Sequence, residues 1–306
     1  MENKTVYIIA GPTAVGKSDV AYYLAKRIGG EIVNCDSVQL YKYMDIGTAK
    51  PSEEEMAAVP HHLYGIVEPD YNMTVATYQK LALTTINNIL SRGKTPIVTG
   101  GTGLYLNSIL YDMNFAGVSN DGGRRAELEK MAEENGNEYM HNYLEAIDPV
   151  SAERIHPNNL RKVIRAIEAY ETGEGIKPMD NCTLNSDYDF RFCVLNMDRA
   201  WLYSRINYRV DKLIKAGLVD EVDKLLAMGY GSDTPSMKSI GYKEIIAYRN
   251  GEYDLDTAIE EIRKNTRHYA KRQLTWLRRY DNAEIIEIHN GESVGNLLDR
   301  IVGEAR

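Results

Sequence analysis

The sequence has few cysteines and no long apolar run, and both absences restrict the classes of protein that it can encode. Its 306 residues include only three cysteines, Cys35, Cys182 and Cys193. Cysteines so few and so far apart form neither a disulfide framework nor the paired ligands of a zinc site. No apolar run reaches the ~18 residues of a membrane-spanning helix. The first residues lead into a strand-like run without the hydrophobic region of a signal peptide. We therefore expect a cytoplasmic protein without membrane association.

The sequence also lacks an excess of positive charge. It carries 36 lysines and arginines against 44 aspartates and glutamates, a net charge of −8, which argues against a dedicated nucleic-acid-binding protein. Residues 154–165 and 263–279 depart from this average, because each segment contains several basic residues and no acidic one. Such basic stripes on an acidic protein indicate a local polyanion site. The alternative is that each stripe is the solvated face of a helix.

Short apolar runs rich in β-branched residues alternate with helical patterns through the first hundred residues. Strands are predicted at residues 6–10, 32–35 and 96–99, and helices at 18–28 and 74–90. This alternation is typical of a parallel α/β sheet, which binds ligands outside the carboxyl ends of its strands. We therefore expect the loops that follow the three strands to lie together at one edge of the sheet.

The pattern changes after the third strand. Residues 124–170 show helical spacing only, and a strand pattern returns at residues 190–195 before further amphipathic helices. This order predicts one α/β core that is interrupted by a helical insert, and not two domains in series. We expect the core to comprise residues 1–115 and 188–306, and the insert to comprise residues 116–187.

A complete phosphate-binding motif lies between the first strand and the first helix. Residues 11–18 match the pattern G-x-x-x-x-G-K-[ST] in the strand–loop–helix context that this motif requires. The backbone N–H groups of such a loop surround phosphate oxygens, its lysine adds positive charge, and its hydroxyl can ligate Mg²⁺. The predicted phosphate-binding residues are Gly11, Pro12, Thr13, Ala14, Val15, Gly16, Lys17 and Ser18, of which Ser18 is the predicted metal ligand. The expected fold class is therefore α/β, with a P-loop NTPase-like parallel sheet core and an inserted all-helical subdomain.

An acidic residue is missing where a P-loop nucleotide hydrolase would place one. The third predicted strand leads into Gly100-Gly101-Thr102-Gly103, whereas the second leads into Asp36, followed by Ser37 and Gln39. Asp36 is therefore a candidate for a metal-associated carboxylate or for a general base beside the phosphate site. The alternative is an aspartate that only stabilises a turn.

Motifs along nearly the whole chain resemble those of the tRNA dimethylallyltransferases. Beyond the P-loop, the motifs occur in the same order as in that family: Asp36 to Tyr41, Met44 to Pro51, His61 to Leu63, Gly100 to Tyr105, Arg154 to Asn158, Arg205-Ile206, Arg209-Val210, Ser239 to Tyr242, Ala270 to Gln273, and Thr275-Trp276. The zinc-finger extension of eukaryotic members is absent, so the resemblance is to the bacterial type.

This resemblance implies a reaction and its partners. In the family, the P-loop binds dimethylallyl diphosphate in place of ATP, and the dimethylallyl group is transferred to N6 of adenine 37 in the anticodon loop of tRNA. The family fold is a P-loop core with a helical insert that contacts tRNA. We therefore expect a monomeric, Mg²⁺-dependent prenyltransferase whose partners are dimethylallyl diphosphate and the anticodon stem-loop of tRNA.

The resemblance also implies residue roles. Asp36 resembles the general base that removes the N6 proton, Thr102 the threonine near the reacting centre, and Arg209 the arginine that binds diphosphate. Ser37 and Gln39 resemble contacts to the target base. The residues that match tRNA-contacting positions are Asp36, Ser37, Val38, Gln39, Thr102, Arg125, Arg161, Lys162, Val163, Ile164, Arg165, Lys271, Arg272, Gln273 and Arg278.

Other functions remain open at this stage. A small-molecule or nucleotide kinase would share the P-loop and Mg²⁺, an RNA-binding switch would use nucleotide for conformational control, and an adenylate isopentenyltransferase would prenylate free AMP. The basic stripes and the helical insert favour RNA as the acceptor. His61 and His62 are predicted to be structural, since no third metal ligand has suitable spacing. Trp276 could stack on a base or be partly buried core.

Overall fold

The computed structural model describes residues 4–113, 122–173 and 182–303, which form two compact units. The larger unit comprises residues 1–110 and 185–306, and the smaller one comprises residues 111–184. The sequence analysis places a helical insert at 116–187, a few residues later at each end than this smaller unit. Residue 116 and the neighbouring segment 174–181 lie outside the described residues.

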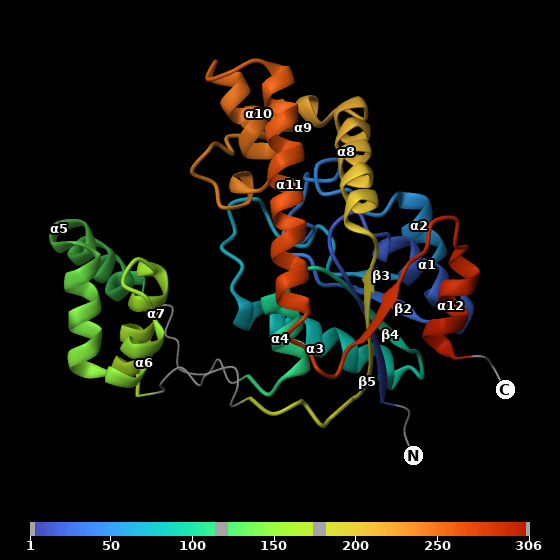
Figure 1. Ribbon diagram of the computed structural model, residues 1–306, viewed down its shortest axis with the longest axis horizontal. Helices are drawn as coiled ribbons and strands as arrows, with labels where there is room; N and C mark the ends of the chain where they lie inside the picture. Colours follow the sequence, from blue (N-terminus) through green and yellow to red (C-terminus); the bar gives the residue numbers. More distant parts are fainter. Residues whose placement is uncertain (1–3, 114–121, 174–181, 304–306) are drawn as a thin grey trace. The chain divides into compact units, whose positions relative to one another are not determined.

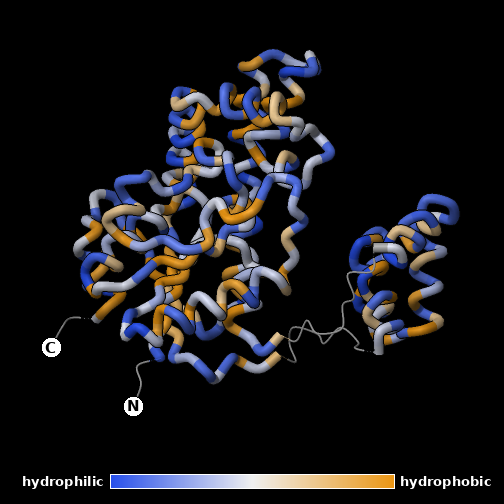
Figure 2. The backbone as a smooth tube through the Cα atoms, turned by 180° about the vertical axis from the view of Figure 1, so that it is seen from behind, coloured by the Kyte–Doolittle hydropathy of each residue, from blue (hydrophilic) through white to orange (hydrophobic). Residues whose placement is uncertain are grey.

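The larger unit is built on a six-stranded, all-parallel sheet with the order β3-β2-β4-β1-β5-β6 (Figure 1). The strands are β1 (Thr5–Ala10), β2 (Glu31–Asn34), β3 (His61–His62), β4 (Pro96–Gly100), β5 (Asp189–Asn196) and β6 (Glu284–Glu287). Every residue of β2 and β4 is buried, as expected for parallel strands that are covered on both faces. In Figure 2 the central strands are among the most hydrophobic parts of this unit.

Helices cover both faces of this sheet. The chain moves from β1 to β2 in one direction and from β3 to β4 in the other, so right-handed crossovers place α1 (Lys17–Ile28) and α3 (Val75–Ser91) on opposite faces. Helix α12 (Val294–Val302) packs with α1 in one apolar cluster. Helix α4 (Gly103–Leu110) packs with α3, where the rings of Tyr78 and Tyr105 are stacked 3.7 Å apart.

A second group of helices lies beyond the carboxyl ends of the strands (Figure 1). It consists of α8 (Arg199–Lys215), α9 (Leu218–Ala227), the 3-10 turn η2 (Ser236–Lys238), α10 (Tyr242–Arg249) and α11 (Leu255–Leu277). These helices share an apolar cluster with Tyr41 and Met44, which belong to the loop after β2. The long helix α11 reaches from this cluster back to α4. The cluster therefore fixes the helices above the edge of the sheet where the phosphate-binding loop is expected.

Short elements are not predicted from the sequence. Helix α2 (Glu53–Ala58) has a capping box in which Ser52 and Glu55 exchange side-chain-to-backbone hydrogen bonds. Strand β3 contains only the two histidines, and His62 Nε2 lies 2.7 Å from Glu31 Oε2. Among the described residues, no group of three or more His, Cys, Asp or Glu could hold a metal ion. The contact of His62 with Glu31 agrees with a structural role for this histidine.

The smaller unit contains α5 (Gly122–Ile147), α6 (Pro149–Arg154) and α7 (Leu160–Glu171). Helix α5 is interrupted at Gly136, where φ is 83°. Residues of all three helices, among them Leu128, Ala152 and Val163, form the apolar core of this unit. In the described part of the chain, no helix has both the length and the apolar character needed to cross a membrane.

Candidate functional site

The P-loop lies between β1 and α1, as the motif predicts. Gly16 caps α1 with φ 104°, and Ala14 also has a positive φ of 65°, so the loop turns sharply into the helix. The Lys17 Nζ donates a hydrogen bond of 2.8 Å to the carbonyl oxygen of Pro12. Burial and, to a smaller extent, the nearby Arg209 lower the pKa of Lys17 to about 8 from 10.5. An anionic ligand would restore the charged form of this lysine, since it removes part of the electrostatic cost.

A strongly basic cavity of about 490 Å³ lies beside this loop, and we call it the P-loop pocket. Its lining residues with positive charge are Lys17, Lys50, Arg205, Arg209 and Lys212. Arg205 Nε donates to the carbonyl oxygen of Ala14 at 2.9 Å, which ties α8 to the loop. Ser18 and Asp19 line the same cavity. Burial raises the pKa of Asp19 above its ordinary value. The cavity therefore favours a compact anion with several negative charges.

A second cavity, of about 360 Å³, adjoins the first, and we call it the Asp36 pocket. Arg209 lines both cavities, so the two share this side chain. Polar residues at one side of the Asp36 pocket include Thr13, Asp36 and Ser37. The apolar residues that line it are Val38, Ile206, Val210, Leu213, Ile240 and Ile262. This cavity can therefore hold an apolar group close to both a carboxylate and the basic P-loop pocket.

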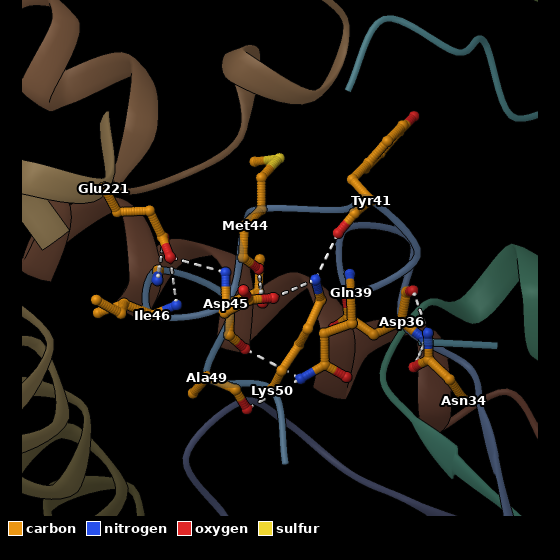
Figure 3. A network of polar contacts seen from close by, with 12 residues as sticks. Asn34, Asp36, Gln39, Tyr41, Met44, Asp45, Ile46, Ala49, Lys50 and Glu221 are labelled. Carbon is orange, nitrogen blue, oxygen red and sulfur yellow. Dashed lines mark hydrogen bonds and ion pairs between the residues drawn. The ribbon is translucent and has the colours of Figure 1, made fainter. Parts of the chain in front are cut away.

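Asp36 stabilises a turn and also lines the Asp36 pocket. Its Oδ1 accepts hydrogen bonds from the backbone N–H of Val38 at 2.9 Å and of Gln39 at 3.4 Å. Its own N–H donates to Asn34 Oδ1 at 2.9 Å, as Figure 3 shows. The carboxylate also interacts electrostatically with Lys17 and Arg209. The turn role and the functional role are therefore compatible, because the turn fixes the carboxylate at the wall of the pocket.

Thr102 connects this turn to the loop after β4 and to helix α11. Its Oγ1 accepts a hydrogen bond of 3.0 Å from the backbone N–H of Ser37 and lies 3.4 Å from the Ser37 hydroxyl. The side chain of Tyr269 on α11 interacts with that of Thr102, and burial raises the pKa of this tyrosine. Thr102 and Ser37 are therefore adjacent, as predicted, and Tyr269 is an additional member of the site.

The amide group of Gln39 is held by the loop that follows it. Its Nε2 donates to the carbonyl oxygens of Thr48 at 3.0 Å and Ala49 at 3.1 Å (Figure 3). Arg209 Nη2 donates to the same Thr48 oxygen at 3.4 Å. Both Gln39 and Arg209 are therefore oriented by the backbone near Thr48. The predicted contact of Gln39 with a base stays a prediction.

Gln273 occupies an unexpected position for a predicted tRNA contact. Its side chain is only 4% exposed and lies between two loops of the phosphate site. Its Oε1 accepts from the Thr13 N–H at 2.8 Å, and its Nε2 donates to the Gly101 carbonyl at 3.0 Å. A Cβ on Gly101 would lie 2.1 Å from this Nε2, so only glycine allows the close approach. In the structure Gln273 thus holds two protein loops together, and its amide is already engaged.

The predicted tRNA-contacting cations of α11 are exposed, and Arg272 also lines the Asp36 pocket. Lys271 and Arg272 are exposed on this helix, and Arg278 is exposed at its C-terminal cap. The Arg272 guanidinium lies 5.7 Å from the ring centre of Tyr269, and that of Arg279 lies 5.4 Å from the ring centre of Trp276. Trp276 is half-buried and donates to the Tyr280 hydroxyl at 3.1 Å. We call these cations and rings the basic face of α11.

The predicted tRNA contacts in the helical unit fall into two groups. Val163 and Ile164 are buried in the apolar core of the unit, so their side chains face other helices. Arg161 and Lys162 are exposed at the start of α7. Arg125 and Arg165 each approach Glu168, with nitrogen–oxygen distances of 3.7 Å. The charged members of the range can therefore meet a polyanion, whereas its two apolar members support the helix.

Several residues that line the P-loop pocket have no role predicted from the sequence. Arg205 and Lys212 stand four residues before and three residues after Arg209, and this helical spacing places all three on one face of α8. That spacing could have identified both residues. Lys50 belongs to the motif from Met44 to Pro51, but its position in the P-loop pocket depends on the path of a loop. Tyr269 is distant from Thr102 in the sequence, and nothing local indicates their contact.

The chain is similar to proteins of known activity over almost its whole length. A family model described as IPP transferase matches residues 39–280, and one described as isopentenyl transferase matches residues 4–66. The tRNA dimethylallyltransferase of Alkaliphilus oremlandii is 51% identical over 301 residues, which are 98% of this chain and 96% of that protein. The tRNA dimethylallyltransferase of Acetivibrio thermocellus is 50% identical over 282 residues, 90% of each chain.

The chain is also similar to solved protein structures. The full-length tRNA isopentenylpyrophosphate transferase of Bacillus halodurans is 40% identical, with a TM-score of 0.73 over 98% of this chain and 96% of that one. A eukaryotic dimethylallyltransferase described as acting on tRNA is 28% identical, with a TM-score of 0.79 over 93% of this chain and 74% of that one. The mixed α/β fold and the parallel sheet predicted from the sequence are thereby confirmed.

Proposed function

Because the chain belongs to the tRNA dimethylallyltransferase family, we propose that it transfers a dimethylallyl group from dimethylallyl diphosphate to N6 of adenine 37 in tRNA. The observation that carries this proposal is the junction of the two pockets at Arg209. The P-loop pocket is lined by five cations and by the acids Asp19 and Glu55. The Asp36 pocket is lined by a carboxylate, by six aliphatic side chains and, besides the shared Arg209, by Lys238, Lys243 and Arg272. The P-loop pocket suits the charged end of a prenyl diphosphate, and the aliphatic wall of the Asp36 pocket suits its apolar end.

The P-loop pocket would bind the diphosphate. The charges of Lys17 and Arg209 would stabilise the negative charge that develops on the leaving group as the bond between the allylic carbon and oxygen breaks. Ser18 and Asp19 line this pocket and are suited to hold Mg²⁺, which commonly binds one or two protein oxygens together with phosphate oxygens and water. The ion would add further neutralisation of the diphosphate charge.

Asp36 would act on the acceptor. The exocyclic N6 of adenine is a poor nucleophile, because its lone pair is delocalised into the ring. As the bond from N6 to the allylic carbon forms, the nitrogen must lose a proton, and a carboxylate within hydrogen-bond distance can accept it. The turn through Val38 and Gln39 holds Asp36 at the pocket wall for this purpose. General-base catalysis of this kind typically contributes about 10²–10⁴-fold to the rate.

The basic face of α11 and the exposed cations of α7 would bind the tRNA backbone. A stacked base reaches an enclosed pocket only when it is flipped out, which costs a few kcal/mol and costs least in a single-stranded loop. Contacts to phosphates offset this cost and orient the RNA. An adenine in an anticodon loop meets these requirements. Because one chain supplies both pockets, the enzyme would act as a monomer. A cytoplasmic location would fit its relatives, which are named for their action on tRNA.

The direct test is an assay with radiolabelled dimethylallyl diphosphate, Mg²⁺ and either unmodified tRNA or free AMP. We expect the label to enter tRNA at adenine 37 and not to enter AMP. Label in AMP alone would identify an adenylate isopentenyltransferase. Hydrolysis of ATP or transfer of its phosphate, without transfer of the prenyl group, would identify a kinase or a nucleotide-driven switch.

A further inference from the structure

A buried carboxylate outside both pockets holds the backbone that separates them. Glu221 on α9 is 7% exposed. Its Oε2 accepts from the N–H groups of Asp45 at 2.8 Å and Ile46 at 2.7 Å. Its Oε1 accepts from the N–H of Gly47 at 2.9 Å and from the Tyr242 hydroxyl at 2.7 Å. Figure 3 shows Glu221 pointing toward this stretch of backbone.

The backbone that Glu221 holds belongs to residues 45–51, which we call the dividing loop. Gly47 and Thr48 line the Asp36 pocket, whereas Ala49, Lys50 and Pro51 line the P-loop pocket. The loop therefore forms part of the wall of each cavity. A shift of this loop changes the shape of both pockets at the same time.

The dividing loop also orients two side chains of the site. The carbonyl oxygen of Thr48 accepts from Gln39 and from Arg209, and that of Ala49 accepts from Gln39. At its far end, Lys50 Nζ donates to the carbonyl of Tyr41 at 2.5 Å and to Asp45 Oδ1 at 2.6 Å (Figure 3). The position of Arg209, where the two cavities meet, is therefore linked through Thr48 to the anchor at Glu221.

The hydrogen bonds that Glu221 accepts explain why a carboxylate occupies this position. Three successive N–H groups point at one carboxylate, and hydrogen bonds to a charged acceptor are shorter and stronger than neutral ones. Four donors compensate the cost of burying this charge. The Tyr242 ring closes the arrangement from the side, because a Cβ on Gly47 would lie 2.6 Å from it. Removal of the carboxylate would leave three partly buried N–H groups without their acceptor.

We propose that Glu221 is a positioning residue for prenyl transfer, which fixes the dividing loop and through it the relative placement of Arg209 and Gln39. This role rests on the proposed function, because prenyl transfer is the reaction for which Glu221 positions the loop. Glu221 lies outside both pocket linings, so it acts through the loop and touches neither substrate. Misplacement of reacting groups by about 1 Å can cost on the order of 10²-fold in rate, so a loop of this kind is well placed to control turnover.

The test compares Glu221→Gln with Asp220→Asn, a matched loss of one negative charge at the exposed neighbouring position of α9. We would measure the melting temperature, the affinities for inorganic diphosphate and tRNA, and the single-turnover rate with both substrates saturating. For Glu221→Gln we expect the rate to fall about tenfold or more, with each affinity within about threefold of wild type. Asp220→Asn should match wild type in every measurement.

Hydrogen exchange of the amides of residues 45–47 gives a readout independent of activity. We expect these amides to lose protection in Glu221→Gln and to keep it in Asp220→Asn. If Glu221→Gln does not fold, Glu221→Asp replaces it, since this change keeps the charge but shortens the side chain, and it alters no residue that lines either pocket. For Glu221→Asp we expect a rate loss of about threefold, together with weaker protection of the same amides.

Each outcome decides a different point. A folded Glu221→Gln variant with the wild-type rate overturns the proposal, even if its melting temperature is lower, because Glu221 is then only structural. A rate loss with unchanged hydrogen exchange at residues 45–47 also overturns the proposal, since Glu221 then does not act through the dividing loop. A wild-type protein that prenylates no RNA overturns the proposed function instead, while the exchange data still decide whether Glu221 anchors the loop.

Discussion

Gln273 on helix α11 accepts a hydrogen bond of 2.8 Å from the backbone N–H of Thr13 in the P-loop. The same side chain donates to Gly101 in the loop after β4. Helix α11 also carries the exposed Lys271 and Arg272 near this position. One helix therefore contacts the phosphate site through Gln273, contributes Arg272 to the lining of the Asp36 pocket and presents Lys271 to solvent.

The first prediction concerns this buried amide. Gln273→Met keeps the approximate shape but removes both hydrogen bonds, which leaves a backbone donor and an acceptor without partners. We expect a loss of unfolding free energy of about 2 kcal/mol in chemical denaturation. We also expect weaker binding of inorganic diphosphate in calorimetry, since the P-loop loses an anchor. Thr275→Ala, an exposed change on the same helix, is the control. Reduced tRNA affinity with unchanged stability would instead support a direct contact of Gln273 with RNA.

The second prediction concerns the charge of Lys17. Its pKa of about 8 means that the empty site loses this charge as the pH rises through 8, whereas a bound diphosphate favours the charged form. Diphosphate affinity should therefore be highest below pH 8 and should fall above it by up to about tenfold per pH unit. Calorimetry with inorganic diphosphate between pH 7 and 9.5 measures this dependence.

Two variants of Lys17 test whether this lysine causes the pH dependence of diphosphate affinity. Lys17→Ala should bind diphosphate weakly at every pH, with the fold intact. Lys17→Arg keeps its charge over the whole range, so this part of the pH dependence should disappear. Wild-type affinity in Lys17→Ala would contradict the assignment of residues 11–18 as the phosphate-binding loop.

The third prediction concerns the basic face of α11. Replacement of Lys271, Arg272 and Arg278 by glutamine should weaken tRNA binding and reduce the slope of log affinity against log salt, by about 0.7–0.9 for each phosphate that the protein no longer neutralises. Diphosphate affinity should hardly change. A control with the exposed Lys26, Lys80 and Lys94 replaced by glutamine has the same net charge. Equal effects in both triple variants would show that the basic stripe of residues 263–279 is only a solvated helix face.

Local patterns were sufficient for the core of the fold and for part of the site. The strand–loop–helix order predicted that the loops after β1, β2 and β4 lie at one edge of the sheet, and the parallel order of the strands confirms it. Asp36, Ser37 and Thr102 lie together for this reason. Helical periodicity within residues 161–165 could also have separated the buried Val163 from the exposed Arg161.

The contacts that fix these loops could not be predicted in the same way. Gln273 and Thr13 are 260 residues apart, and Glu221 and Asp45 are 176 residues apart. Their partners are backbone N–H groups, which every residue except proline possesses, so no sequence pattern identifies them. Only the packing of α9 and α11 over the edge of the sheet brings the pairs together. Elements as short as β3, with two residues, also give no periodic signal.

The most direct test of the account is the rate of transfer by Asp36→Asn. Asparagine retains an oxygen that can accept the hydrogen bonds from Val38 and Gln39, so the turn should persist, but its amide cannot take the N6 proton. Single-turnover transfer from labelled dimethylallyl diphosphate to tRNA would be measured across a Mg²⁺ titration. We predict a rate at least about 10²-fold below wild type at every Mg²⁺ concentration, with both substrates still bound. Recovery to near the wild-type rate at high Mg²⁺ would contradict the account, because Asp36 would then serve the metal ion and not the proton.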